Sequence, residues 1–70
     1  MAETVYKFIE LVGTSDESWE KAASAAVARA RQSLRGLRVA EVSELDLQLG
    51  DDGQVERYRA KVKVSFKYED

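Results

Sequence analysis

The sequence contains no cysteine and no histidine, and these two absences remove most of the chemistry that stabilises small domains or makes them catalytic. Without cysteine the chain can form no disulfide and no thiolate zinc site, and without histidine it has no imidazole base or ligand. The metals still compatible with its side chains are hard cations bound by oxygen, such as Ca²⁺ and Mg²⁺. The remaining candidate nucleophiles and bases are carboxylates, Lys, Tyr and Ser, and no arrangement of them stands out. We therefore expect a protein that is not an enzyme.

The lack of a large net charge and of long apolar runs excludes further classes of protein. The net charge of −2 argues against nucleic-acid binding by bulk charge, and no apolar run is long enough to span a membrane. The N-terminus shows no signal-peptide pattern, so we expect a cytoplasmic protein. The 70 residues suffice for a single domain, residues 1–70. Because so short a chain buries little surface, we expect it to be stabilised by association with further copies of itself.

The first strand is predicted over residues 4–13, "TVYKFIELVG", where apolar residues occupy both faces. A strand of this kind is typically buried twice, once by its own domain and once by another body. One face carries Tyr6, Phe8 and Val12, and the other carries Val5, Ile9 and Leu11.

A helix is predicted within residues 13–36, with Ser15 or Ser18 as its N-cap and Gly36 as the C′ residue. Its apolar face is mostly alanine, so it can lie very close to a sheet. We interpret Trp19 as a core anchor at the helix start rather than as a platform for a ligand.

The second strand, residues 37–50, changes its apolar phase midway, from Ala40 and Val42 to Leu45, Leu47 and Leu49. Two explanations stay open: a β-bulge near Ser43 and Glu44, or packing of the second half on a different body. The "GDDG" that follows is interpreted as a hairpin turn rather than a calcium loop, because it lacks the ligand spacing of an EF-hand.

The third strand, residues 54–70, has one apolar and one basic face. We interpret the basic face as solvated or paired with carboxylates such as Glu10, Glu44 and Asp46, and an anion site is the alternative. The predicted fold class is therefore α+β, in the order β-α-β-β. The third strand lies in the middle of a three-stranded antiparallel sheet that wraps around one helix.

Four sequence blocks make the chain resemble dodecins over nearly its whole length: "VYKFIELVGTS" at 5–15, "SWEKAA" at 18–23, "VAEV" at 39–42 and "KVSFKYED" at 63–70. Dodecins are small β-α-β-β proteins that assemble into hollow dodecamers. Many of them bind flavins such as riboflavin or FMN in pairs near two-fold axes. The resemblance implies a homododecamer, and the family acts in storing or quenching flavin rather than in catalysis.

Two positions differ from the flavin-binding dodecins. A stacking Trp there matches Val39, and a Gln that hydrogen-bonds the flavin matches Arg59. Valine offers no π-face, and Arg cannot accept a hydrogen bond, so we do not expect tight flavin binding. Val and Arg at these positions are similar to the calcium dodecin branch of the family. A flavin-binding dodecin that stores or quenches flavin remains the alternative.

Glu17 and Glu44 are the metal-ligand candidates, because the matching positions in related dodecins lie near a bound divalent cation. We expect these two carboxylates to approach each other, within or between subunits, and to share Ca²⁺ or Mg²⁺. Plain surface carboxylates are the other interpretation. The expected function is a dodecin-like homo-oligomeric cage that holds divalent cations or a small anionic ligand.

Overall fold

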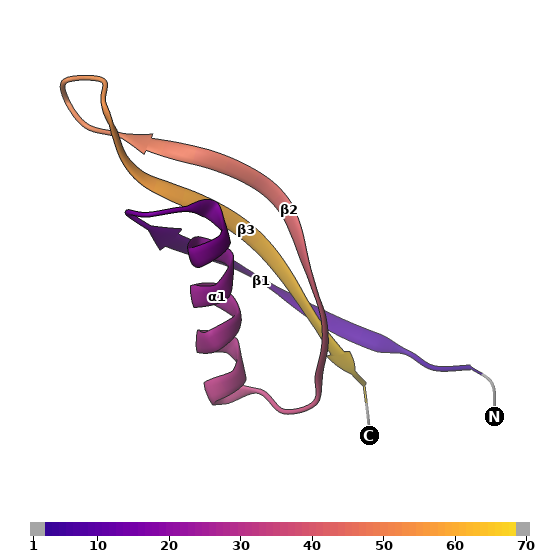
Figure 1. Ribbon diagram of the computed structural model, residues 1–70. Coiled ribbons are helices and arrows are strands. Elements are labelled where there is room, and N and C mark those ends of the chain that lie inside the picture. Colours follow the sequence, from indigo (N-terminus) through magenta and orange to yellow (C-terminus); the bar gives the residue numbers. More distant parts are fainter. Residues whose placement is uncertain (1–2, 69–70) are drawn as a thin grey trace.

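The computed structural model describes residues 3–68 and contains three strands and one helix (Figure 1). These are β1 (Tyr6–Ser15), α1 (Trp19–Ser33), β2 (Leu37–Leu49) and β3 (Val55–Lys67). All strand pairs are antiparallel and the order in the sheet is β1-β3-β2. The predicted fold class, the element order and the central position of the last strand are confirmed.

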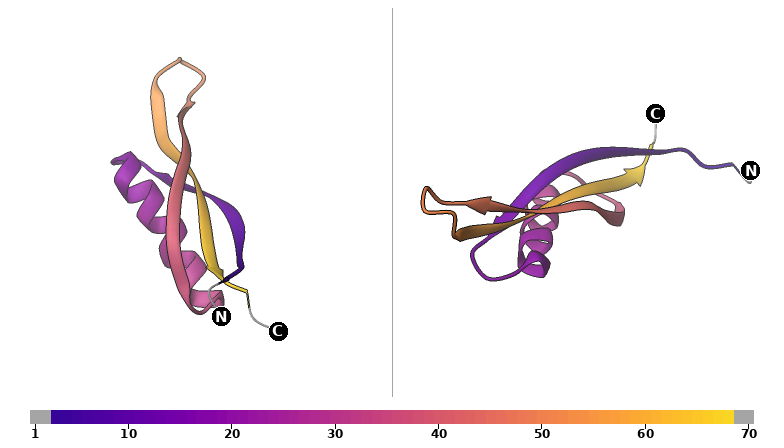
Figure 2. Two further views of the ribbon diagram at one scale, coloured as in Figure 1. Left: turned by 90° about the vertical axis from the view of Figure 1, so that its right-hand side faces the viewer. Right: turned by 90° about the horizontal axis from the view of Figure 1, so that it is seen from above.

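Helix α1 lies against one face of the sheet (Figure 2). Ser18 is its N-cap, and the Ser18 hydroxyl accepts a hydrogen bond from the backbone N–H of Lys21 at 3.1 Å. The helix ends at Ser33, with Leu34 as C-cap. The prediction of Gly36 as the C′ residue was wrong by one position: Gly36, at φ +70°, forms the turn into β2 one residue later. Its missing Cβ permits that left-handed conformation.

The core consists of six small residues, and its smallness sets the distance between helix and sheet. Ala22, Ala26 and Ala30 of α1 pack on a row of β3 residues, namely Ala60, Val62 and Val64. On β1 the closest approach is at Gly13, where an added Cβ would lie 1.9 Å from the carbonyl oxygen of Ala22. The expectation that an alanine face brings the helix very close to the sheet is confirmed.

A β-bulge at Ser43 explains the change of apolar phase in β2. Val42 lies opposite Val62, but Glu44 lies opposite Lys61, so Ser43 is the extra residue. Its hydroxyl donates to the carbonyl oxygen of Lys61 at 3.2 Å. One added residue reverses the alternation, and the apolar residues before and after it therefore stay on the helix side of the sheet.

The β2–β3 hairpin extends past α1 and closes at the predicted turn (Figure 1). The backbone N–H of Gly53 donates to the carbonyl of Gly50 at 2.9 Å, and Asp52 accepts from the backbone N–H of Gln54 at 3.0 Å. Among the described residues the positive φ of this turn falls on Gly53 and not on an aspartate. No helix within residues 3–68 is long and apolar enough to cross a membrane.

Candidate functional site

The face of the sheet that points away from α1 carries most of the charged side chains of the three strands, and we call it the open face. Its residues alternate with the buried ones of β3, so the central strand presents a basic row beside three acidic residues of β2 and one of β1. The open face comprises Tyr6, Phe8, Glu10, Val12, Thr14, Val39, Glu41, Glu44, Asp46, Gln48, Arg57, Arg59, Lys61, Lys63, Ser65 and Lys67.

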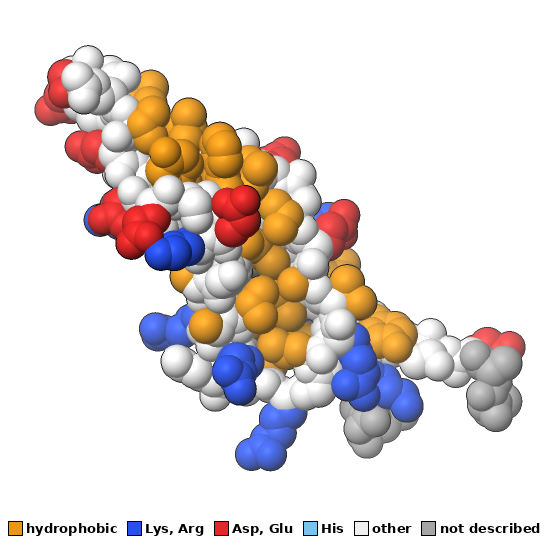
Figure 3. Space-filling view, viewed as in Figure 1, with side chains coloured by type: hydrophobic (Ala, Val, Ile, Leu, Met, Phe, Trp, Pro, Cys, Tyr) orange, Lys and Arg blue, Asp and Glu red, His pale blue; other side chains and the backbone are white. Residues whose placement is uncertain are grey.

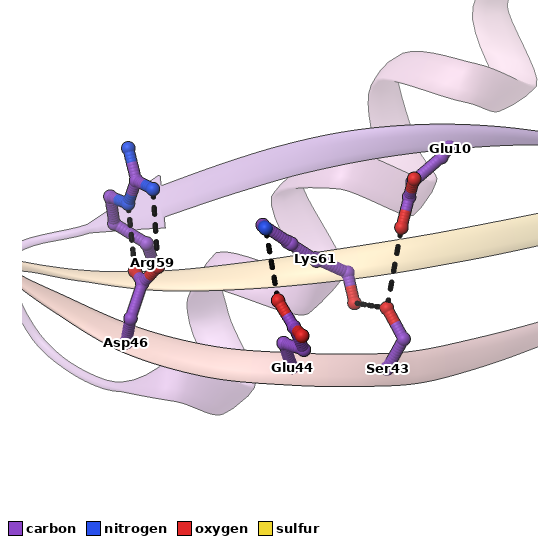
Figure 4. A network of polar contacts seen from close by, with 6 residues as sticks. All are labelled: Glu10, Ser43, Glu44, Asp46, Arg59 and Lys61. Atoms are coloured by element: carbon purple, nitrogen blue, oxygen red, sulfur yellow. Dashed lines mark hydrogen bonds and ion pairs between the residues drawn. The ribbon is translucent and has the colours of Figure 1, made fainter.

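Two cross-strand ion pairs join β2 to β3 on the open face (Figure 4). The guanidinium of Arg59 donates from Nε to Asp46 Oδ1 at 2.7 Å and from Nη2 to Oδ2 at 3.1 Å. Lys61 Nζ lies 2.9 Å from Glu44 Oε1. For these two cations the interpretation of a basic face paired with neighbouring carboxylates is confirmed.

The same contacts shift the ionisation of these groups. The hydrogen bond from Arg59 holds the pKa of Asp46 below its ordinary value of 3.8, and that bond raises the pKa of Arg59 in turn. The hydrogen bond to Glu44 raises the pKa of Lys61. The bond from Arg59 favours the charged form of Asp46, so Asp46 is a weaker base than an isolated carboxylate.

Asp46 also connects the sheet to the start of α1. Its main-chain carbonyl accepts a hydrogen bond from the indole N–H of Trp19 at 3.1 Å. The half-buried Trp19 ring meets Tyr58 edge to face, with centroids 5.2 Å apart. Trp19 therefore anchors the helix start, but it lies outside the core cluster, contrary to the prediction of a core residue. Asp46 is held by Trp19 on one side of the sheet and by Arg59 on the other.

The sequence did not identify the pairing of Asp46 with Arg59, although both residues were named. Counting strand partners outward from the Gly50–Gly53 turn would have found it, but the count requires one irregularity to be known: Leu49 lies opposite Val55 and Gln48 opposite Arg57, so Glu56 is an extra residue on β3. By contrast, the contact of Glu17 with Lys21 has a direct sequence signal, because residues four apart are neighbours on a helix surface.

The two flavin-position equivalents both lie on the open face but far apart within one chain. Val39 lies opposite Ser65, and Arg59 is six residues further along β3. At about 3.3 Å per residue this is a separation of roughly 20 Å, longer than a three-ring heterocycle. A small ligand that touched both positions would therefore have to lie between two chains.

The metal-ligand candidates Glu17 and Glu44 are not brought together within one chain. Glu17 precedes α1 and pairs with Lys21, whereas Glu44 lies on the open face and pairs with Lys61. Within residues 3–68 no three acidic side chains converge as a cation site would require. A shared cation would need carboxylates from several chains, and the approach of Glu17 to Glu44 stays a prediction.

On the helix side, the hairpin arm exposes a band of large apolar side chains that we call the apolar strip. Figure 3 shows it as a continuous orange surface along the arm, beyond the part that α1 covers. Beside it, a hollow of about 420 Å³ opens between α1 and β2, lined by side chains that include Ala23, Val27 and Ala40. The apolar strip comprises Val42, Leu45, Leu47, Leu49 and Val55, which are 42–56% exposed.

Comparison with known proteins gives a consistent result. The family model described as Dodecin matches residues 5–69. The chain is 50% identical over 64 residues to calcium dodecin of Mycobacterium tuberculosis, covering 91% of this chain and 89% of that protein. It is 47% identical over 66 residues to dodecin of Thermus thermophilus, covering 94% of each.

A solved structure extends the likeness to three dimensions. The crystal structure of the Mycobacterium tuberculosis calcium dodecin is described as that of a calcium-chelating immunodominant antigen with a novel calcium-binding site. It matches this chain with a TM-score of 0.81 at 48% identity, over 94% of this chain and 93% of that one.

Proposed function

This chain belongs to the dodecin family, and from that membership we propose that it forms a cytoplasmic, hollow homododecamer that binds ions or small ligands and catalyses no reaction. The observation that carries the proposal is the apolar strip, which the chain's own helix leaves about half exposed. A row of half-exposed leucines is unfavourable in water and is typical of a surface that meets another protein surface.

The total exposed surface supports association. The chain exposes 5540 Å² at a mass of 7.9 kDa. A compact monomer of that mass is expected to expose about 4,400 Å². The excess, roughly 1,100 Å², exceeds the ~800 Å² that each partner contributes to a standard interface. Covering the arm with neighbouring chains would remove this excess.

We propose Ca²⁺ as the bound ion, with Mg²⁺ as the alternative, held by Glu17 and Glu44 of different chains. Carboxylate oxygens are the ligands that hard cations prefer. The 50% identity to a protein named calcium dodecin supports the choice. In one chain each carboxylate is matched by a lysine, so the cation has to displace Lys21 and Lys61. Two carboxylates that met without a cation would repel each other.

Thermal unfolding with Ca²⁺ and with a chelator tests the metal site. Calcium at a hundredfold excess over its dissociation constant should stabilise the assembled protein by about 2.7 kcal/mol, because it binds only the folded form. The rise in melting temperature should be smaller in Glu17→Gln and in Glu44→Gln.

Two acidic residues serve as matched controls for this experiment. Glu20 lies in the first turn of α1, near Glu17, and Glu41 lies on β2 opposite Lys63, as Glu44 lies opposite Lys61. Glu20→Gln and Glu41→Gln should respond to Ca²⁺ like the parent. A melting temperature that is the same in chelator and in Ca²⁺ contradicts the site, and so does a full response in both Glu17→Gln and Glu44→Gln.

A further inference from the structure

Arg59 is held by Asp46 in the geometry that arginine uses to recognise an oxyanion. The Nε and Nη2 donors point at the two carboxylate oxygens at 2.7 and 3.1 Å, so one of the two sides on which a guanidinium can bind an oxyanion through paired N–H groups is already occupied (Figure 4). Both side chains are partly exposed, 38% for Arg59 and 44% for Asp46, so a ligand in solution could reach the pair.

We infer that Asp46 is a specificity-determining residue that closes Arg59 to anionic ligands, phosphate monoesters above all. The inference deepens the proposed function, since it takes Arg59 to line a ligand site. An incoming phosphate has two routes, and both are unfavourable. It can displace the carboxylate and leave that charge without its partner, or it can share the guanidinium and stand beside a like charge.

The backbone of Asp46 is held in this position. Its main-chain carbonyl accepts a hydrogen bond from the indole N–H of Trp19, which belongs to the start of α1. Its strand neighbour Glu44 is engaged with Lys61, so that lysine does not offer a second unpaired cation beside Arg59. The open face therefore presents a neutralised pair at the position where the sequence alone suggests a basic one.

Riboflavin and FMN form a suitable pair of probes, because they share one ring system and differ by a phosphate monoester. Fluorescence titration of the assembled protein gives the ratio of the riboflavin to the FMN dissociation constant. For Asp46→Asn this ratio should rise about tenfold over the parent, the effect expected when a guanidinium gains a charge-assisted hydrogen bond to phosphate. Asp46→Ser, which has no amide to hold Arg59, should behave alike.

Two controls separate release of Arg59 from a simple change of charge. Glu41→Gln removes one negative charge from the same strand and face without touching Arg59, and it should leave the ratio within about twofold of the parent. Asp46→Asn combined with Arg59→Gln should lose the gain.

The inference is overturned if the ratio rises in neither Asp46→Asn nor Asp46→Ser. It is also overturned if FMN binding is too weak to detect in both of these variants. An equal rise in Glu41→Gln, or a gain that survives Arg59→Gln, overturns it as well. Failure of the proposed cage or of the Ca²⁺ site would appear separately, in the mass of the particle and in the calcium-dependent melting temperature.

Discussion

Single side chains determine what the open face can recognise. Val39 is 61% exposed and lies beside the small Ser65, so position 39 is accessible but its side chain offers no aromatic ring on which a flavin could stack. Arg59 is committed to Asp46. The sequence predicted both departures from a flavin site, since each follows from residue identity alone. It did not predict what Arg59 binds instead, because that depends on strand register.

Restoring the ring at position 39 should restore part of the flavin affinity. Stacking is worth about 0.5–1.5 kcal/mol beyond area burial, so Val39→Trp should strengthen riboflavin binding about two- to tenfold. Adding Arg59→Gln should strengthen it further, because Gln can both donate and accept. Fluorescence quenching of riboflavin measures both effects.

A tryptophan on the opposite face of the same strand is the control for that experiment. Val42 is 47% exposed and lies on the helix side, so Val42→Trp should leave riboflavin affinity unchanged as long as the variant has the same particle mass as the parent. Tight riboflavin binding by the parent protein would show that the site needs no stacking ring.

At the scale of elements, the contact between β1 and α1 is the most tightly constrained in the fold. An alanine at Gly13 would place its Cβ against the backbone of Ala22, which cannot rotate away as a side chain could. Gly13→Ala should therefore lower the free energy of unfolding by about 3 kcal/mol, the upper range for overpacking. Thr14→Ala, at the next, exposed position, should cost less than about 1 kcal/mol.

Chemical denaturation at one protein concentration compares these two variants, since the stability of an oligomer depends on concentration. Equal losses of stability in Gly13→Ala and Thr14→Ala would show that helix and sheet can separate without cost, contrary to the close packing described above.

The helix and strands also show which structural features could be predicted from sequence patterns. Alternation and helical spacing predicted the element order and the alanine face, and they gave a bulge near Ser43 as one of two explanations for the phase change, because each is a local pattern of polarity. They did not fix the end of α1, since Gly36 serves equally as a helix stop or as a later turn residue. The patterns also could not place Glu17 relative to Glu44, because these residues belong to segments on different sides of the sheet. A contact between residues of two subunits does not produce a periodic pattern in the sequence.

For the whole molecule, the decisive feature is the imbalance between core and surface. Among residues 3–68 no fully buried side chain is larger than valine, while five large apolar residues of the apolar strip remain about half exposed. A domain of this size gains little stability from such a core. Contacts between chains, which cover the apolar strip, are therefore expected to supply much of the stability of the folded protein.

Light scattering coupled to size-exclusion chromatography measures the mass of the particle directly. The proposed cage predicts about twelve times the chain mass of 7.9 kDa, unchanged on dilution to the micromolar range. A particle with the mass of a single chain at micromolar concentration would contradict it.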